Sequence, residues 1–293
     1  MRSKKGYLAL GSIALAVAIA AWMLPGQRPP PSTGEQDQAA AAAVPLPVPR
    51  DKAAALSATK IDPTVVVPAA GHAFSIVRQQ RLPDTDPLDH VRSLLGRSQA
   101  GDAAATYEIY LVVSQCNATL EVPDPGLLQV YRKAGAEKSY LESLETNFDR
   151  CQSLTAEQAL SAQPWLARAA GQGSVEAKIM FAIDSKSIIG DRSGYLAHAE
   201  QLVQYRQDAM RHLHEAASLG SVDALMHLAT SYDAGVLTAP SQMQSLAYYK
   251  AVNAVQPNAN LQTLIDRKTQ GMSAQDVQRA SGEAERILAA CCR

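Results

Sequence analysis

One phrase occurs twice in this chain and constrains what the chain can fold into. The stretch AAGQGSVEAKIMFA at 169–182 returns as AASLGSVDALMHLA at 216–229, which places Gly173 and Gly220 47 residues apart. Two alanines precede the glycine in each copy at the same offset, and a serine and an apolar run follow it. A fainter copy, GRSQAGDAAATYEIYL, places Gly101 at the same point of the phrase. A unit repeated in this way predicts a stack of similar structural units.

The residues around each glycine predict a helical hairpin. Glycine at the end of a helix adopts the left-handed conformation that other residues resist. Ser174, Ser221 or Asp102 follows directly and is a good N-cap for the next helix. The inward positions of that helix in the last copy are Ala224, Leu225, Leu228, Ala229 and Tyr232. Because one hairpin cannot cover its own apolar face, neighbouring hairpins must stack.

The last copy, 216–255, resembles the Sel-one-like repeat, a relative of the tetratricopeptide repeat. Tyr232 and Gly235 supply the Tyr-x-x-Gly end of its first helix, and the second helix carries Ala247, Tyr248 and Ala251 in the run AYYKA. The copy at 173 matches half of this pattern, and the copy at 101 matches less. The resemblance therefore spans about 94–255 in degenerate form. It implies a bacterial protein with an all-α fold, a right-handed α-solenoid of helix-turn-helix repeats.

Capping signals and apolar spacing predict the remaining helices. The expected helices cover about 86–98, 102–116, 125–134, 137–151, 194–218 and 273–290. A Thr155–Gln158 capping box is expected to open a further helix near Leu154, which Pro164 kinks or divides. The helix capped at Ser273 is expected to close the open end of the stack.

The first 24 residues are typical of an export segment. A basic start, MRSKK, precedes an uncharged apolar run that begins at Tyr7 and ends at Leu24, long enough to span a bilayer at the lower limit. Trp22 lies where an interfacial aromatic residue belongs. We expect a single-pass anchor in the bacterial inner membrane, with the body in the periplasm. The alternative is a cleaved signal peptide and a soluble periplasmic protein, because Ala18 to Ala20 form a passable cleavage site.

A proline- and alanine-rich stretch, 25–85, separates this segment from the helices. Such a composition buries too little apolar surface to offset the entropy of ordering it, so the stretch is expected to be a mostly disordered linker. The segment Thr64 to Val67 is a candidate for a short extended piece against the body. The helical domain is then 86–293.

Composition and motifs argue against several classes of function. A net charge of −1 leaves no basic surface for nucleic acid. The chain has no phosphate-binding, dinucleotide-binding or nucleophile-elbow motif, so we expect no cofactor, no small-molecule substrate and no catalytic site. His212 and His214 diverge on a helix, and Ser218 stands where the motif H-E-x-x-H needs its second histidine. No metal site is therefore expected.

The tyrosines of the last repeat have two interpretations. The first is that Tyr232, Tyr248 and Tyr249 fill the gaps between repeat helices. The second is that Tyr249 lies exposed on the concave wall and anchors a partner peptide.

Four cysteines complete the local signals. Cys116 lies in line with Ala105, Ile109 and Val112, and Cys151 in line with an apolar stripe on its own helix. Both thiols are therefore expected on core-facing sides, and three consecutive helices running up, down and up would bring them to the same end. A disulfide between them suits an oxidising compartment. Two buried free thiols are the alternative. The state of the adjacent pair, Cys291 and Cys292, stays open.

We therefore expect a non-catalytic adaptor or scaffold that binds a protein or peptide on the concave face of a helical-repeat solenoid. A periplasmic chaperone-like factor, or an accessory factor for secretion or envelope stress, is the alternative. An enzyme is the alternative of another class.

Overall fold

The computed structural model describes residues 61–78, 81–121, 123–190 and 199–293. The chain divides into two compact units, and all described residues belong to the second, Pro45–Arg293. The apolar run at 7–24 and most of the expected linker lie outside the described residues. Within the part of the chain that is described, no helix has the length and apolar character needed to cross a membrane.

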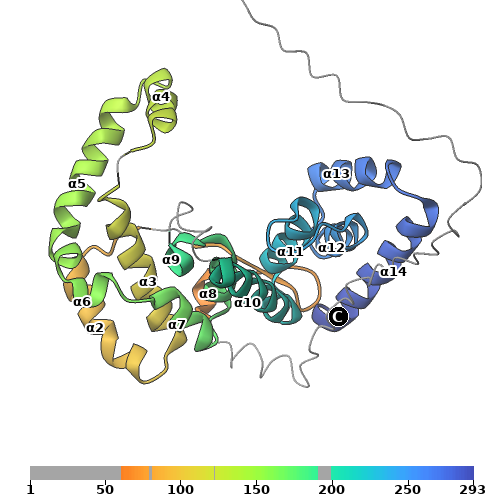
Figure 1. Cartoon of the computed structure of the whole chain (residues 1–293), viewed down its shortest axis with the longest axis horizontal. Helices are drawn as coiled ribbons and strands as arrows, with labels where there is room; N and C mark the ends of the chain where they lie inside the picture. Colours follow the sequence, from red (N-terminus) through yellow and green to blue (C-terminus); the bar gives the residue numbers. More distant parts are fainter. Residues whose placement is uncertain (1–60, 79–80, 122, 191–198) are drawn as a thin grey trace, which may run out of the picture. The chain divides into compact units, whose positions relative to one another are not determined.

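The described residues are mostly helical (Figure 1). The helices are α2 (Pro87–Gln99), α3 (Ala103–Ala118), α4 (Pro125–Lys133), α5 (Glu137–Ala156), α6 (Gln158–Ser161), α7 (Trp165–Gly171), α8 (Val175–Ile183), α9 (Lys186–Ile189), α10 (Ala199–Ser218), α11 (Val222–Ala234), α12 (Gln242–Val255), α13 (Ala259–Gln270) and α14 (Ala274–Cys291). A 3₁₀ turn (Pro63–Val65) and two strands, β1 (Val66–Pro68) and β2 (Phe74–Ile76), precede them.

Helices that follow one another along the chain pack against each other. The contacts run from α2 to α3, then to α7, α8, α10, α11, α12 and α14. Three of these contacting pairs are the expected hairpins: α2 with α3, α7 with α8, and α10 with α11. Their facing sides contribute to one continuous apolar core. A helical-repeat fold is therefore present in the chain's own contacts.

The same turn joins the helices of all three hairpins. Gly101, Gly173 and Gly220 have φ angles of 89°, 101° and 96°. The residue after each glycine donates its N–H to the carbonyl five residues back, at 3.0, 3.1 and 3.2 Å, and the glycine N–H binds the carbonyl three residues back. These two hydrogen bonds together form the Schellman motif at a helix C-terminus, which requires a residue in the left-handed conformation, here glycine. The side chains of Asp102, Ser174 and Ser221 then cap the next helix as predicted.

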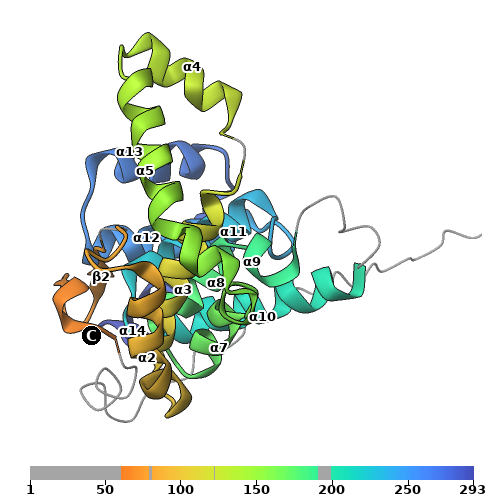
Figure 2. The same ribbon diagram turned by 90° about the vertical axis from the view of Figure 1, so that its left-hand side faces the viewer.

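A fourth hairpin, α4 with α5, uses the same turn without the polar cap. Gly135 has a φ angle of 71°, and Ala136 donates its N–H to the carbonyl of Tyr131. The pair is visible in Figure 2. It is poorly covered, because α4 buries no residue and α5 buries only Cys151 and Leu154. The exposed large apolar side chains of this region are Leu120, Leu127, Val130, Leu141 and Phe148.

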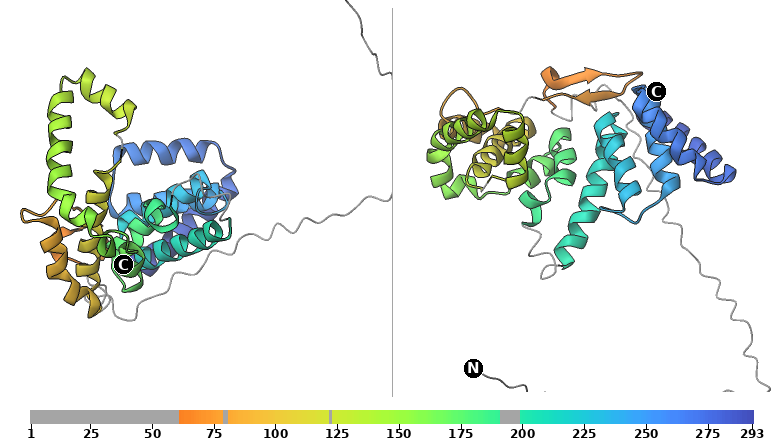
Figure 3. Two further views of the ribbon diagram at one scale, coloured as in Figure 1. Left: turned by 60° about the vertical axis from the view of Figure 1, so that its left-hand side comes forward. Right: turned by 90° about the horizontal axis from the view of Figure 1, so that it is seen from above.

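Ordered structure begins before residue 86, and the candidate extended piece at Thr64 to Val67 overlaps β1. The linker was expected to reach residue 85, but β1 and β2 form an antiparallel pair in which Val67 faces Ser75. Phe74 is 3% exposed and forms a parallel bridge with Ser221. Figure 3 shows the pair, in orange, beside the end of α14. The helix ends to which the strand pair is hydrogen-bonded lie more than 140 residues further along the chain, so no local pattern could reveal where the pair docks.

Two helix boundaries also differ from the expectation. The helix expected to end at Cys151 continues to Ala156, and Thr155 does not cap a new helix. Its hydroxyl donates to the carbonyl of Cys151 at 3.0 Å, which keeps Thr155 inside the last turn. The helix α13 was not anticipated. The terminal helix is capped at Ser273 as predicted, and it packs on α12.

Candidate functional site

A cavity of about 350 Å³ lies between β2 and the second helices of the three hairpins. Its lining residues are Ile76, Arg78, Tyr107, Glu176, Ile179, Met180, Ile183, Asp223 and His227. The volume lies within the range of pockets that hold small ligands or single side chains of a partner. The lining combines an apolar floor from α8 with acidic and basic groups at its edge.

The cavity is built from equivalent positions of the repeated phrase. Glu176 and Asp223 each stand three residues after the repeat glycine, Tyr107 and Ile179 stand six after it, and Met180 and His227 seven after it. We call these six positions the repeat face. The turn at each glycine sets the direction in which the next helix starts, so equal positions come to lie on one side. The face is therefore a product of the repetition.

The segment that ends β2 lies along the repeat face. The N–H of Ile76 donates to Asp223 Oδ2 at 2.8 Å. Two residues further on, Arg78 donates from Nε to Glu176 Oε1 at 2.7 Å, and from a terminal nitrogen to Oε2 at 3.1 Å. Such a forked arginine–carboxylate pair is a strong interaction. Glu108 and Asp62 lie 3.4 and 3.6 Å from the same guanidinium.

The charges of the site are unbalanced and partly buried. The carboxylates of Asp62, Glu108 and Glu176 surround the single guanidinium of Arg78. Burial acts to lower the pKa of Arg78, but these carboxylates together raise it. Burial raises the pKa of Glu176, although Arg78 opposes the shift. Three carboxylates therefore meet at one guanidinium, and His90 Nε2 lies 3.6 Å from one of them, Glu108.

The other edge of the cavity shows the same cost of burial. Burial raises the pKa of Asp223, against the effect of the N–H that it accepts from Ile76. Burial also lowers the pKa of His227, and Asp223 only partly offsets this.

The tyrosines of the last repeat pack inside the fold. Tyr232 and Tyr248 stack with their ring centroids 5.8 Å apart. Tyr248 and Tyr249 are each 4% exposed, and Lys268 Nζ lies 5.6 Å from the Tyr249 ring centroid. The second interpretation, an exposed Tyr249 that faces a partner, is therefore wrong, because Lys268 of α13 lies over its ring. The gap-filling interpretation describes what the structure shows.

The other repeat positions serve the helix geometry. Gly235 ends α11 in the left-handed conformation, with a φ angle of 68°. Ala247 and Ala251 are fully buried on α12, where small side chains let α11 and α14 approach.

The histidines of α10 lie in the packed interior. His212 meets the ring of Phe181 edge-on, with the centroids 5.0 Å apart, and His214 lies 3.4 Å from the Tyr248 hydroxyl. Burial lowers the pKa of His214 to about 4. Among the described residues, no group of three or more histidine, cysteine or acidic side chains is placed to hold a metal ion.

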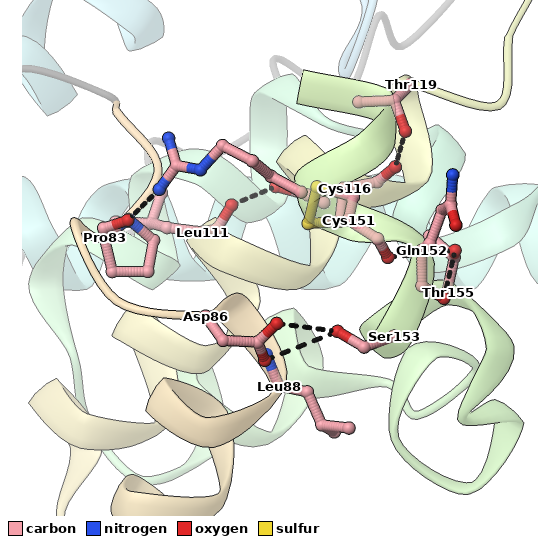
Figure 4. The surroundings of a disulfide bond; sticks show 12 residues. Pro83, Asp86, Leu88, Leu111, Cys116, Thr119, Cys151, Gln152, Ser153 and Thr155 are labelled. Atoms are coloured by element: carbon pink, nitrogen blue, oxygen red, sulfur yellow. Dashed lines mark hydrogen bonds between the residues drawn. A yellow bond between two sulfur atoms is a disulfide. The ribbon is translucent and has the colours of Figure 1, made fainter. Parts of the chain in front are cut away.

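All four cysteines are in disulfides. Cys116 and Cys151 form the expected bridge between α3 and α5 (Figure 4). Beside it, Asp86 caps α2 and accepts the Ser153 hydroxyl at 3.0 Å, and Arg150 donates to the carbonyl of Pro83. Cys291 and Cys292, left open by the sequence, form a second disulfide.

Sequence reasoning missed the residues that form the cavity. Arg78 lies in the stretch interpreted as linker, and no motif or spacing singled out Glu176. One signal was present, because both well-formed copies of the phrase place an acidic residue three positions after the glycine. In the structure both of these carboxylates, Glu176 and Asp223, bind the segment that ends β2.

Comparison with known proteins adds little to this description. No protein-family model matches the sequence, and no curated protein matches it. One solved structure that is similar is a protective antigen of uropathogenic Escherichia coli strains, described as displaying an SLR fold. The identity is 15%, the TM-score is 0.37, and the match covers 71% of this chain and 42% of the antigen. At that TM-score the likeness supports no conclusion, and the repeat architecture rests on the chain's own turns and contacts.

Proposed function

We propose that this chain is a non-catalytic binding protein that holds a segment of a partner protein on the repeat face. The observation that carries the proposal is the cavity itself, an apolar floor on α8 edged by two carboxylates at equivalent repeat positions, the buried Glu176 and the half-buried Asp223. Side chains of a partner that enter such a pocket give an interface its central, water-excluding contacts. Repeat proteins work through surfaces of this kind, in which each unit contributes the same position.

We also propose that the protein acts in the bacterial periplasm, attached to the inner membrane by residues 7–24. The apolar run and its basic start support this placement, and two disulfides suit an oxidising compartment. The protein should then fractionate with membranes and carry an intact N-terminus in mass spectrometry. Recovery of a soluble form that begins near Ala21 would contradict the anchor and favour signal cleavage.

The binding proposal is tested by crosslinking in intact cells. Ile183 lines the cavity and is 49% exposed, so it accepts a photo-crosslinking residue without loss of packing. Val203 on α10 is 55% exposed and is not a cavity residue, which makes it a matched control. A single adduct is expected from position 183 and none from position 203.

The captured protein is then purified and titrated against the purified chain. His227→Ala should weaken binding by about tenfold or more, the 1.4 kcal/mol of an ordinary interface anchor, and Val203→Ala should leave it unchanged. Adducts from both positions, or equal affinity for both variants, would place the partner elsewhere and refute the proposal.

A further inference from the structure

The segment from Ala70 to Arg78 lies on the helices as a bound peptide lies on a receptor. The N–H of Ala70 donates to the carbonyl of Val255, the N–H of His72 to Cys292, and the N–H of Phe74 to Gly220, at 3.0, 2.8 and 2.9 Å. These carbonyls stand at the ends of α12, α14 and α10, where helices leave acceptors without an internal partner. The segment thus supplies donors to three helix ends in turn.

Beyond Phe74 the segment changes from backbone to side-chain contacts. Ile76 binds Asp223 on α11, and Arg78 binds Glu176 on α8, the same position of the preceding repeat. Two extended residues advance by about 6.6 Å, and a long side chain covers the rest of a helix spacing of about 8–10 Å. The two residues from Ile76 to Arg78 therefore span the distance from one repeat to the preceding one.

The two parts of the segment differ in how firmly they are held. Phe74 is 3% exposed, but Val77 is 63% exposed. The stretch 76–78 is held to the helices by the Ile76 hydrogen bond and the ion pairs of Arg78, and to the 3₁₀ turn before β1 by the Val77 N–H, which donates to the Val65 carbonyl at 2.8 Å. The cavity beneath it stays open along Ile179, Met180 and Ile183.

We propose that the repeat face recognises an extended cationic segment of its partner, with an apolar residue two positions before an arginine or lysine. Residues 76–78 are an internal copy of that ligand, and the partner replaces them while Phe74 stays docked. Charge complementarity favours this occupant, since Asp62, Glu108 and Glu176 all lie within 3.6 Å of the Arg78 guanidinium, whose place a cationic side chain of the partner would take. This inference rests on the proposed function and names the chemistry of the partner.

The test asks whether the face binds the segment supplied as a separate molecule. The full chain is prepared with Ile76→Gly, Val77→Gly and Arg78→Gly, which removes the internal side chains and keeps Phe74. The probe is the blocked peptide Ser-Ile-Val-Arg, a copy of residues 75–78. Binding is followed by NMR titration, and a peptide with glutamine in place of arginine is the matched control.

The arginine peptide should bind the triple variant at least about tenfold more tightly than the unaltered chain, whose own segment competes. Glu176→Gln in the triple variant, or glutamine in the peptide, should weaken binding about 10- to 100-fold, the usual value of a charged hydrogen-bonded pair. Equal binding of both peptides, or no binding to a folded triple variant, overturns the inference.

If the triple variant does not fold, Arg78→Gln alone replaces it. This variant should bind the arginine peptide more tightly than the unaltered chain does, and failure to do so overturns the inference as well. The proposed function is judged separately. An adduct from position 183 in cells, together with no affinity for the peptide, would keep the binding face and reject its cationic ligand.

Discussion

Gly220 and Gly101 occupy the same point of the repeat but differ in what an added methyl group would meet. A Cβ at Gly220 would lie 2.7 Å from the His72 carbonyl oxygen and 3.3 Å from the Ala73 Cα. A Cβ at Gly101 would have no such neighbour within 4 Å. Substitution by alanine therefore separates two costs that a single variant would mix.

Both alanine variants bear the cost of a left-handed backbone, about 1–2 kcal/mol. Gly220→Ala must in addition move the strand pair, because the atoms that its methyl group meets belong to backbone. If the pair detaches, the Phe74 N–H loses its bond to Gly220, about 0.5–1.5 kcal/mol, and the Phe74 side chain loses its burial, about 1.5–3 kcal/mol. From Phe74 alone the extra loss in Gly220→Ala is then at least about 2–4.5 kcal/mol, and the bonds of Ala70, His72 and Ile76 to the helices add to it.

Urea unfolding measures the two losses, and limited trypsin digestion assigns them. Arg78 is held against Glu176 in the intact protein, so cleavage after Arg78 should become fast in Gly220→Ala and stay slow in Gly101→Ala. The reasoning would be refuted by equal destabilisation of the two variants. It would also be refuted by an unchanged cleavage pattern in a clearly destabilised Gly220→Ala.

Three further outcomes follow from the packing and the charges. Replacing Cys116 and Cys151 by alanine should lower the free energy of unfolding by about 4 kcal/mol by the chain-entropy relation, because their bridge closes a 35-residue separation. Replacing the adjacent Cys291 and Cys292 should lower it far less. Urea midpoints that fall equally in both double variants would contradict this. His214 has a pKa of about 4 in the folded protein against the usual 6.5, so the unfolded chain binds the proton more tightly. As the pH falls from 6.5 to 4, the free energy of unfolding should therefore decrease by about 1.4 kcal/mol per pH unit. His214→Gln should remove this part of the slope, and parallel stability curves for the two proteins would show that His214 does not cause it. Tyr249→Ala should lower stability by about 3–5 kcal/mol, the cost of an aromatic core truncation, while Tyr140→Ala on the poorly covered α5 should lower it much less; thermal melts check both, and a mild effect at Tyr249 would restore its surface role.

Local signals predicted most of the hairpins, because each helix end is fixed by residues close to it in sequence. The glycine, its preceding alanines and the capping serine all act within one turn, and three copies behave alike in the structure. The stripe of Ala105, Ile109, Val112 and Cys116 is buried as expected. The bridge to Cys151 followed from that stripe and from the order of the helices.

Long-range contacts account for what the sequence did not reveal. The stripe on α5 was expected to face the core, yet its members Leu141 and Phe148 are 45% and 42% exposed, and α4, which pairs with α5, buries no residue of its own. Periodicity indicates which residues share a side, but not whether a neighbour covers it. Arg78 was missed for a similar reason, since its partners Glu108 and Glu176 lie 30 and 98 residues away.

The contacts of the strand pair also fix how late in synthesis the pair can dock. Cys292, whose carbonyl accepts the His72 N–H, is synthesised 220 residues after His72. At about 5–20 residues per second, roughly 10–45 s pass before that bond can form. Phe74 has no docking place until the helix ends that receive the segment have been made. A chain that stops short of Cys292 lacks one of these receivers. The strand pair can thus dock fully only after Cys292 has been made, and an undocked pair presents an apolar segment to proteases.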